Sequence, residues 1–487
     1  MDQSERHSIE QKKLCHHCVG DLYLSEMIRS EGTRLRCSYC ERTAKAFRLN
    51  VLASLVDQAF ERHYVRTSDQ PSSWQYSMLA DRESDYEWER DGEPVVDAIM
   101  NAADMPEEAA GDIQRLLEDE YSDWDSAQMG EETAYADDSY YEERATTDGR
   151  WQEEWEGFEL SVKTEARFFS RTAERVLQSV FGNLEDLPTL DSRPLLVTAG
   201  PGTTVSTFYR ARAFQSYDRL EEAIARPDLH MGPPPSLLAN AGRMNARGIA
   251  VFYGSDDSRA ALAEVRPPVG SNVVVAQFEI MRPIRLLDLT ALDAVSAGGS
   301  VFDPELGDRL ERAMFLRSLS QRITRPVMPD DEAFEYLATQ AVADFLATGQ
   351  AGNIDGILFP SVQVEGVSMN VVLFHKAARV CPMDLPKGTE IQARSGSLYE
   401  DGWETEFEVI EEVPPAPSDK KVEQSAFSPL WALPGYGGFG PYDPDMREYT
   451  LRVDLSSVQV HAVQSVSFGT QDYPVRRRRW EKRDWEF

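Results

Sequence analysis

The fold of this chain is decided by residues 242–265, which read GRMNARGIAVFYGSDDSRAALAEV. The apolar run 249–253 predicts a strand, and the alanine-rich run 258–265 predicts a helix. Ser258 belongs to the residue types that cap helices at their first turn. A strand that ends at Tyr253 and a helix that carries Glu264 about two turns further on would place both side chains beside one cleft.

Two further polar clusters flank this unit, FYRAR at 208–212 and DGILFPSVQVEGVSMNVVLF at 355–374. Short β-like runs and two helical stretches surround them, and this mixture predicts an α+β domain with an antiparallel or mixed sheet. The strands are expected at 205–212, 249–253, 273–280, 354–359 and 371–374, and the helices at 258–265 and 331–346.

An arginine in the first cluster, a glutamate in the second and a serine after a proline in the third follow one another in that order. A GR-x-N motif and a tyrosine eleven residues before the glutamate complete the pattern. This pattern resembles the RES domain, which is named for its Arg, Glu and Ser. The resemblance implies an enzyme that consumes NAD⁺, a fold similar to ADP-ribosyltransferases, and a toxin or defence role.

The resemblance identifies Arg210, Glu264 and Ser361 as catalytic candidates. A carboxylate such as that of Glu264 stabilises the positive charge on ribose as nicotinamide leaves. Arginine suits the pyrophosphate because its guanidinium binds phosphate oxygens in pairs. The serine hydroxyl is expected to orient a ribose, a phosphate or the incoming nucleophile. The candidates for binding NAD⁺ are Tyr209, Arg243, Asn245, Tyr253 and Asn370.

The function inferred from the resemblance is cleavage of the nicotinamide glycosidic bond by phosphorolysis or hydrolysis. One alternative is a protein ADP-ribosyltransferase, and another is a non-catalytic zinc-ribbon sensor or binding protein. The residues leave the acceptor open between phosphate, water and a protein side chain. RES proteins commonly pair with an antitoxin, so an inhibitory protein partner is expected.

Four of the five cysteines form two close pairs, Cys15-x2-Cys18 and Cys37-x2-Cys40, with eighteen residues between the pairs. This spacing is typical of a tetrahedral structural zinc site. The spacer has room for a small hairpin, with Leu22, Leu24, Met27 and Ile28 as its apolar residues. We therefore predict a Zn²⁺ ribbon.

A helical region is expected after the ribbon, with one helix over 44–64 and a second over 162–181 that stops at Gly182-Asn183. Residues 81–160 between them hold 28 acidic and 5 basic residues, a composition typical of a solvated linker with one short helix near Ile113. An acidic surface for a basic partner, or a lid over the enzyme, is the alternative. The arrangement resembles the HEPN/RES N-terminal module. The Arg…His pair of active HEPN ribonucleases is missing, so the resemblance implies a scaffold or sensing role.

The predicted domains are the ribbon (1–43), the helical acidic region (44–190), the RES domain (195–380) and a C-terminal extension (381–487). In that extension 451–466 is expected to form strands that complete the preceding sheet, and the end carries a basic patch at Arg476–Arg483. The formal charge of −33 argues against nucleic acid as a partner. No leader pattern or spanning apolar run is present, which predicts a cytoplasmic protein without a membrane partner.

Overall fold

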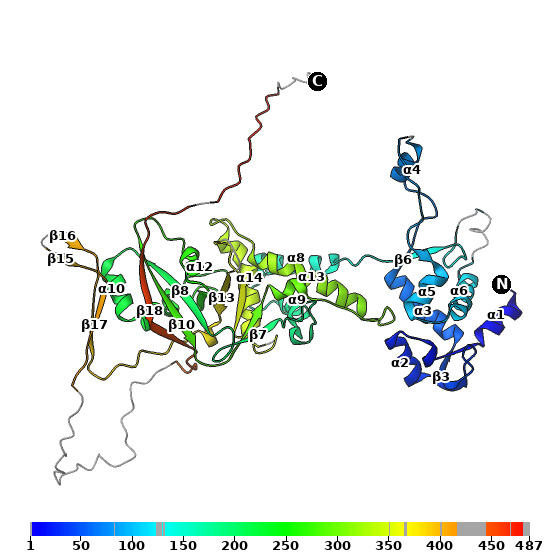
Figure 1. Ribbon diagram of the computed structural model, residues 1–487, viewed down its shortest axis with the longest axis horizontal. Coiled ribbons are helices and arrows are strands. Elements are labelled where there is room, and N and C mark those ends of the chain that lie inside the picture. Colours follow the sequence, from blue (N-terminus) through cyan, green and yellow to red (C-terminus); the bar gives the residue numbers. More distant parts are fainter. Residues whose placement is uncertain are drawn as a thin grey trace, which may run out of the picture. The chain divides into compact units, whose positions relative to one another are not determined.

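The computed structural model describes residues 2–81, 83–122, 129, 132–349, 351–364, 368–399, 402–415, 445–467 and 469–480. Two units emerge from its contacts: residues 1–195 with 291–325, and residues 196–290 with 326–487. Figure 1 shows helices dominating the first and a large sheet at the centre of the second. Within the described ranges no helix is both long and apolar enough to cross a membrane.

The second unit is built on one eight-stranded sheet in the order β18-β10-β8-β9-β13-β12-β11-β7. The pair β11–β12 is parallel, whereas the other described pairs of this sheet are antiparallel, so the predicted mixed sheet and α+β class are confirmed. The strands of this sheet are β7 (Leu196–Ala199), β8 (Thr207–Phe214), β9 (Phe252–Ser255), β10 (Asn272–Ile280), β11 (Ile284–Asp288), β12 (Gly356–Pro360), β13 (Met369–Leu373) and β18 (Leu451–Ala462).

The helices of this unit lie between the strands, and a small extension follows β13. Helix α14 confirms the helix predicted over 331–346. Strand β18 pairs with β10, so the prediction that 451–466 completes the preceding sheet is also confirmed. The helices and extension strands are α10 (Tyr217–Ala225), α11 (Pro227–His230), α12 (Ser258–Glu264), α14 (Glu332–Ala347), β14 (Glu390–Arg394), β15 (Ser397–Tyr399), β16 (Gly402–Glu404) and β17 (Glu408–Glu412), with 3₁₀ turns at Ser236–Leu238 and His375–Ala377.

The apolar core of this unit follows the two-residue alternation of the strands. Phe208, Phe252 and Phe278 are fully buried on one face of the sheet, in a cluster with residues of α10 and β18. Tyr209, Tyr253 and Asn370 belong to the opposite face by the same alternation. This difference determines which candidate side chains share a site.

The first unit begins with the ribbon. Its three-stranded antiparallel sheet, in the order β1-β3-β2, is packed against α2 and α3. Helices α3, α5 and α6 pack together beside a second small sheet, β4-β6-β5, whereas α8 packs against α9 and α13. The elements of this unit are α1 (Gln3–Glu10), β1 (Lys13–Cys15), α2 (Leu22–Glu31), β2 (Thr33–Arg36), β3 (Thr43–Arg48), α3 (Leu49–His63), β4 (Tyr64–Arg66), α4 (Ser73–Ala80), β5 (Glu93–Pro94), α5 (Val95–Ala103), α6 (Glu107–Tyr121), β6 (Tyr140–Glu143), α8 (Gly149–Thr164), α9 (Arg171–Phe181) and α13 (Leu306–Thr324), with 3₁₀ turns at His16–Cys18, Leu184–Asp186 and Ala291–Ala294.

Three predictions for this unit need correction. The spacer between the cysteine pairs is helix α2 followed by a strand rather than a hairpin, and Leu22 is 85% exposed. Residues 44–48 belong to β3, so the helix predicted over 44–64 begins only at Leu49. The helix predicted over 162–181 is two helices, and Phe168 and Phe169 lie exposed between them. Its stop is confirmed, because Asn183 after α9 adopts a left-handed backbone with φ 52°.

The acidic region is also more ordered than a solvated linker. Helices α5 and α6 bury Ile99, Ile113 and Leu117 completely or nearly so, in one core with the ribbon. Trp155 of α8 packs on Phe315 of α13, with ring centroids 5.6 Å apart. The acidic residues therefore occupy the outer faces of packed elements over most of this region, while residues 123–128 lie outside the described part.

Asp112 of α6 links that helix to the ribbon. Its carboxylate is 1% exposed and accepts hydrogen bonds from the Tyr39 hydroxyl at 2.7 Å and from Lys12. Arg115 lies 2.5 Å away on the same helix. Burial, together with the adjacent Asp112, raises the pKa of Tyr39 well above its ordinary value.

Removing this carboxylate with Asp112→Ala should destabilise the first unit by about 3 kcal/mol, because Lys12 and the Tyr39 hydroxyl lose a fully buried charged partner. Denaturant unfolding followed by a signal confined to this unit would measure the change. The exposed Glu120 at the end of the same helix provides the control, and Glu120→Ala should leave the midpoint almost unmoved. Equal midpoints for the two variants would show that Asp112 does not connect α6 to the ribbon.

Candidate functional site

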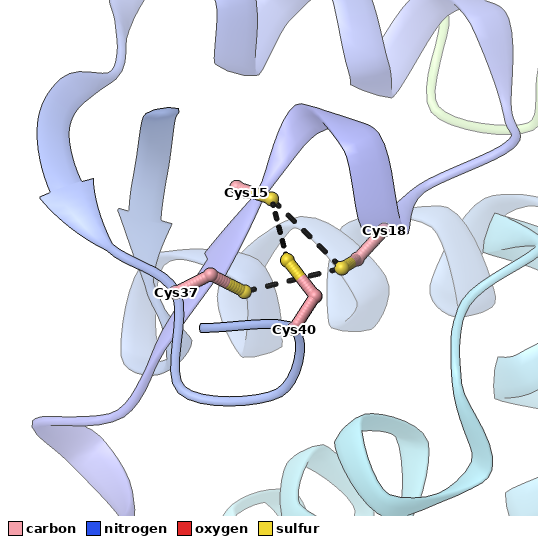
Figure 2. Close-up of side chains that lie close together, drawn as sticks. All are labelled: Cys15, Cys18, Cys37 and Cys40. Carbon is pink, nitrogen blue, oxygen red and sulfur yellow. Dashed lines mark hydrogen bonds between the residues drawn. The ribbon is translucent and has the colours of Figure 1, made fainter. Parts of the chain in front are cut away.

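The four ribbon cysteines lie at one point of the first unit (Figure 2). Cys15 ends β1 and Cys18 closes the following 3₁₀ turn, while Cys37 and Cys40 flank the turn between β2 and β3. Their Sγ atoms all lie within 4.8 Å of one another. The closest pairs are Cys15–Cys40 at 3.6 Å and Cys15–Cys18 at 3.8 Å.

This geometry fits Zn²⁺. Four thiolates at the usual Zn–S distance of about 2.3 Å form a tetrahedron whose sulfurs are separated by about 3.8 Å. Cys15 and Cys37 are buried and the other two are half-buried, so a metal here would be shielded from exchange. The cluster is compatible with a closed structural site, since four sulfurs leave no position open for substrate.

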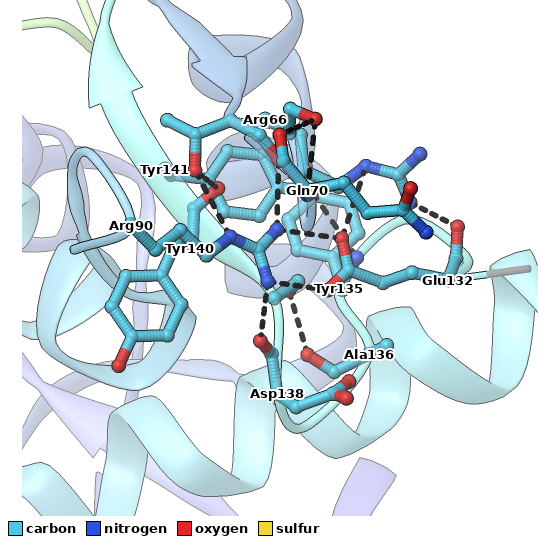
Figure 3. A network of polar contacts seen from close by, with 12 residues as sticks. Arg66, Gln70, Arg90, Glu132, Tyr135, Ala136, Asp138, Tyr140 and Tyr141 are labelled. Carbon is cyan, nitrogen blue, oxygen red and sulfur yellow. Dashed lines mark hydrogen bonds and ion pairs between the residues drawn. The ribbon is translucent and has the colours of Figure 1, made fainter. Parts of the chain in front are cut away.

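A second polar cluster in this unit closes the loop that carries α4 (Figure 3). Arg90 binds both carboxylate oxygens of Glu132, at 2.7 and 2.8 Å, and also donates to the carbonyl oxygens of Thr67 and Asp138. Its guanidinium lies 5.0 Å from the ring centre of Tyr140. Every partner belongs to the same module, which makes the cluster a structural anchor.

The second unit brings together three polar side chains predicted from the sequence. Oε1 of Glu264 accepts one hydrogen bond from the Ser361 hydroxyl and one from the Asn370 amide, each at 2.8 Å. Ser361 and Asn370 are buried, whereas the glutamate itself is exposed. In the described part of the chain the other oxygen, Oε2, has no protein partner. One oxygen is thus fixed and the other is free to meet a ligand.

Local structure explains this convergence. Asp257, rather than the predicted Ser258, caps α12 by accepting from the amides of Arg259 and Ala260. The helix ends at Glu264, seven residues later. Asn370 pairs with Ser255 across β13 and β9, and Ser255 pairs with Tyr209 of β8. Tyr209, Ser255 and Asn370 therefore form a row on the face of the sheet that Glu264 contacts.

Asn370 has a further feature: its Oδ1 is buried without a hydrogen-bond partner among the described residues. Unsatisfied buried acceptors are rare and costly. Because the amide nitrogen of Asn370 is committed to Glu264, this side chain has one unused acceptor beside the carboxylate. We take it as a mark of a functional site.

Arg210 is placed differently. Strand alternation directs its side chain toward the Phe208 face, where the guanidinium lies 5.0 Å from the ring centre of Phe252. Its Nη1 donates to the carbonyl oxygen of Tyr253 at 3.1 Å, across the junction of β8 and β9. Those strands share a single residue pair, Tyr209–Ser255, whereas β8 and β10 pair along their whole length. The arginine thus sits where the two halves of the sheet diverge.

The charge of Arg210 is unbalanced. Burial, reinforced by the neighbouring Arg212, lowers the pKa of Arg210 to about 10, which leaves it protonated at neutral pH. Within the described ranges no carboxylate pairs with it. A desolvated cation without a protein anion is unfavourable by itself and is suited to an anionic ligand.

Tyr253 and Asn245 hold the loop that carries Arg243. The tyrosine hydroxyl donates to Oδ1 of Asn245 at 2.9 Å and accepts from the Met244 amide at 3.1 Å. Burial raises the pKa of Tyr253 to about 12. The amide nitrogen of Asn245 is also fully used, by the carbonyl oxygens of Asn240, Ala246 and Ile249.

Gly242 is required in this loop because a Cβ there would lie 2.7 Å from Oδ1 of Asn245 and 2.8 Å from the Tyr253 hydroxyl. Helix α14 fixes the same loop: Thr339 donates to the carbonyl of Arg243 and Gln340 to that of Gly242. Arg243 itself lies over the ring of Tyr336, 4.9 Å from its centre. Sequence reasoning missed these three residues of α14, since nothing in an ordinary helix pattern marks them.

The comparisons with known proteins match two parts of the chain. The RES domain model matches residues 207–392, a range that includes all eight candidate residues of the second unit. The HEPN/RES N-terminal domain 1 model matches residues 30–176. Both parts of the resemblance seen in the sequence are confirmed. A search of curated proteins found no match.

Proposed function

Because the chain joins a HEPN/RES N-terminal domain to a RES domain, we propose that it cleaves the bond between nicotinamide and ribose in NAD⁺. One observation carries the proposal: a carboxylate, Glu264, with one oxygen fixed by Ser361 and Asn370 and the other without a partner among the described residues. The likeness of the domain to ADP-ribosyltransferases belongs to the same proposal and would place the reacting ribose beside Glu264.

The chemistry needs such a carboxylate. As the C1′–N bond breaks, nicotinamide leaves as a neutral base with the bonding electron pair, and positive charge develops on the ribose ring. A carboxylate held in place before the reaction stabilises that charge without reorganising. Ser361 and Asn370 act as positioning residues in this account, because their hydrogen bonds are to the glutamate.

Arg243 accounts for binding of the pyrophosphate, because α14 holds it on the same loop as Asn245. Arg210 has a desolvated charge that no carboxylate of the described residues pairs with. Its side chain lies on the face of the sheet opposite Glu264, so we assign it to the junction of β8 and β9, where it would reach an anionic part of the ligand. Asn245 and Tyr253 use their polar atoms within the protein, so we assign them to shaping the loop rather than to direct hydrogen bonds with NAD⁺. The ring of Tyr209 remains a candidate for stacking on a base.

Phosphate is the acceptor that this site favours. A phosphate dianion is already a nucleophile, and its oxygen forms the new bond to C1′ without giving up a proton. Water must lose a proton as it attacks, and Glu264 would then have to serve both as charge stabiliser and as base. In phosphorolysis Glu264 needs only to stabilise the developing positive charge.

The hydrogen bonds to Glu264 can be tested separately from the carboxylate. Ser361→Ala and Asn370→Ala should each lower kcat by about 10- to 100-fold, with a smaller change in KM, because the carboxylate loses its orientation. Chromatographic measurement of nicotinamide release over a range of NAD⁺ concentrations would give both constants. A change in KM alone would instead assign these residues to substrate binding.

A protein acceptor is the second candidate. The segment before Arg243 presents Leu237 and Leu238, which are 97% and 70% exposed, shortly after three prolines that restrict the backbone. An exposed apolar pair of this kind is suited to contact a protein. Transfer of label from adenine-labelled NAD⁺ onto protein would favour this activity, whereas label found only in small molecules would exclude it.

The first unit is proposed as a scaffold or sensing module rather than a ribonuclease. A toxin-like role through NAD⁺ depletion and an inhibitory protein partner follow from the RES assignment and belong to this proposal. Expression of the chain with neighbouring reading frames, followed by co-purification, would test the partner. A partner that restores the cellular NAD⁺ level while it binds the chain is the expected result.

A further inference from the structure

A groove with apolar walls lies beside the edge strand β18. Its volume is about 450 Å³, and it is lined by Phe407 and Val409 of the extension and by Leu455, Val458 and Val460 of β18. The end of α10 closes it at Ile224. Val458 and Val460 pack against the core of the unit, so the groove is a part of the core face that the described chain leaves open.

The groove has an acidic residue in its lining, Glu411 of β17. Glu408 and Glu412 point to the other face of that strand by alternation, and Glu408 pairs with Arg394. Residues 382–415, which contain this strand, hold nine acidic and two basic residues. An occupant with apolar anchors and positive charge would therefore match both the apolar walls and the acidic residue.

Such a segment exists in the same chain. Residues 469–480, the C-terminal arm, form neither helix nor strand, and their side chains are exposed. Tyr473, Val475 and Trp480 are 75%, 92% and 82% exposed, and Arg476–Arg479 lie among them. Figure 1 shows the arm, in dark red, leading away from the sheet that it follows.

We propose that the C-terminal arm of one copy binds the groove beside β18 of a second copy, and that the exchange is reciprocal. A tryptophan next to arginines is the typical anchor of a protein interface. The arginines would face Glu411, while an aromatic side chain fills the apolar walls. A second copy is the occupant because each chain extends its arm away from its own groove.

The edge of β18 shows how the arm would be held. The pairing of β18 with β10 shifts register between Val275 and Gln277, so residues 455–458 bulge from the ladder. A bulged edge resists the addition of another strand. Side chains, rather than a continued β-ladder, would therefore carry the contact, and charge reversal should disrupt it.

Light scattering on the full chain would test the exchange. The wild type should form dimers at about 100 μM or below, and reversal of Arg476–Arg479 to glutamate should weaken self-association by about tenfold or more. Replacing the same four residues by lysine keeps the charge and should leave most of the association. Trp480→Ala should weaken it without changing the net charge.

A mixing experiment separates exchange from other dimers. One variant ends at Asp472 and lacks the arm, and the other carries Glu411→Lys with Val458→Asp in the groove. Neither should self-associate, yet their mixture should form a 1:1 complex through one arm and one groove. Because the double groove variant could fail to fold, Glu411→Lys alone is also tested. It should keep the melting curve of the wild type and still lose self-association. A monomeric wild type, or a dimer that persists without the arm, would overturn the proposal, and neither result bears on NAD⁺ cleavage.

Discussion

Replacing Glu264 with glutamine is expected to slow nicotinamide release from NAD⁺ by about a thousandfold. Glutamine keeps the size of the side chain and can still accept from Ser361 and Asn370, but it lacks the negative charge that the developing cation needs. Because Glu264 is exposed at the end of α12, the substitution should leave the melting temperature almost unchanged. Chromatography of the reaction products at saturating NAD⁺ would give the change in kcat.

Glu279 provides the matched control. It is also a glutamate of the second unit, on strand β10, but its carboxylate pairs at 2.7 Å with Arg452 of β18. Glu279→Gln should retain activity within about twofold of the wild type. Equal rates for the two variants would remove Glu264 from the chemistry and would refute the proposed mechanism.

Replacing Cys15 and Cys18 together by serine is expected to abolish metal binding and to unfold the ribbon. Structural zinc contributes about 10–16 kcal/mol to modules of this kind at neutral pH. The ribbon also shares its core with α5 and α6, so the loss should spread to those helices. The zinc content measured by elemental analysis should fall from about one ion per chain to none. Hydrogen exchange should accelerate across the described residues of 9–121.

Cys381 allows a control for the loss of a thiol. It is the fifth cysteine, lies outside the cluster and belongs to the second unit. Cys381→Ser should keep both the zinc content and the exchange pattern. Full zinc content in the Cys15/Cys18 double variant would contradict the assignment of the ribbon as a metal centre.

Local pattern was enough to predict much of the second unit. The short β-like runs located the strands of the site, including β10 and β13, and the apolar pattern located α14. The polar clusters around Arg210, Glu264 and Ser361 marked the candidate residues. The cysteine spacing located the metal centre for the same reason, since two short knuckles define it. Each of these signals is contained in a few neighbouring residues.

Long-range packing explains most of what the sequence missed. The exposure of Phe168 and Phe169 depends on a break between α8 and α9 that apolar spacing does not reveal. The acidic composition of 81–160 concealed Ile99 and Ile113, because charge on the outer face of a helix does not prevent burial of its inner face. The positions of Arg210 and Ser361 relative to Glu264 depend on strand pairing. Only the register of β8, β9 and β13 distinguishes a serine that positions Glu264 from one that orients the incoming nucleophile.

Cleavage of NAD⁺ can be observed by incubating the purified full-length protein with NAD⁺, with and without inorganic phosphate, and identifying the products by mass spectrometry. We expect nicotinamide to appear together with phosphorylated ADP-ribose, and both products to depend on added phosphate. Free ADP-ribose in either buffer would retain the cleavage but replace phosphate by water as the acceptor. NAD⁺ that remains intact in both buffers would refute the proposed cleavage.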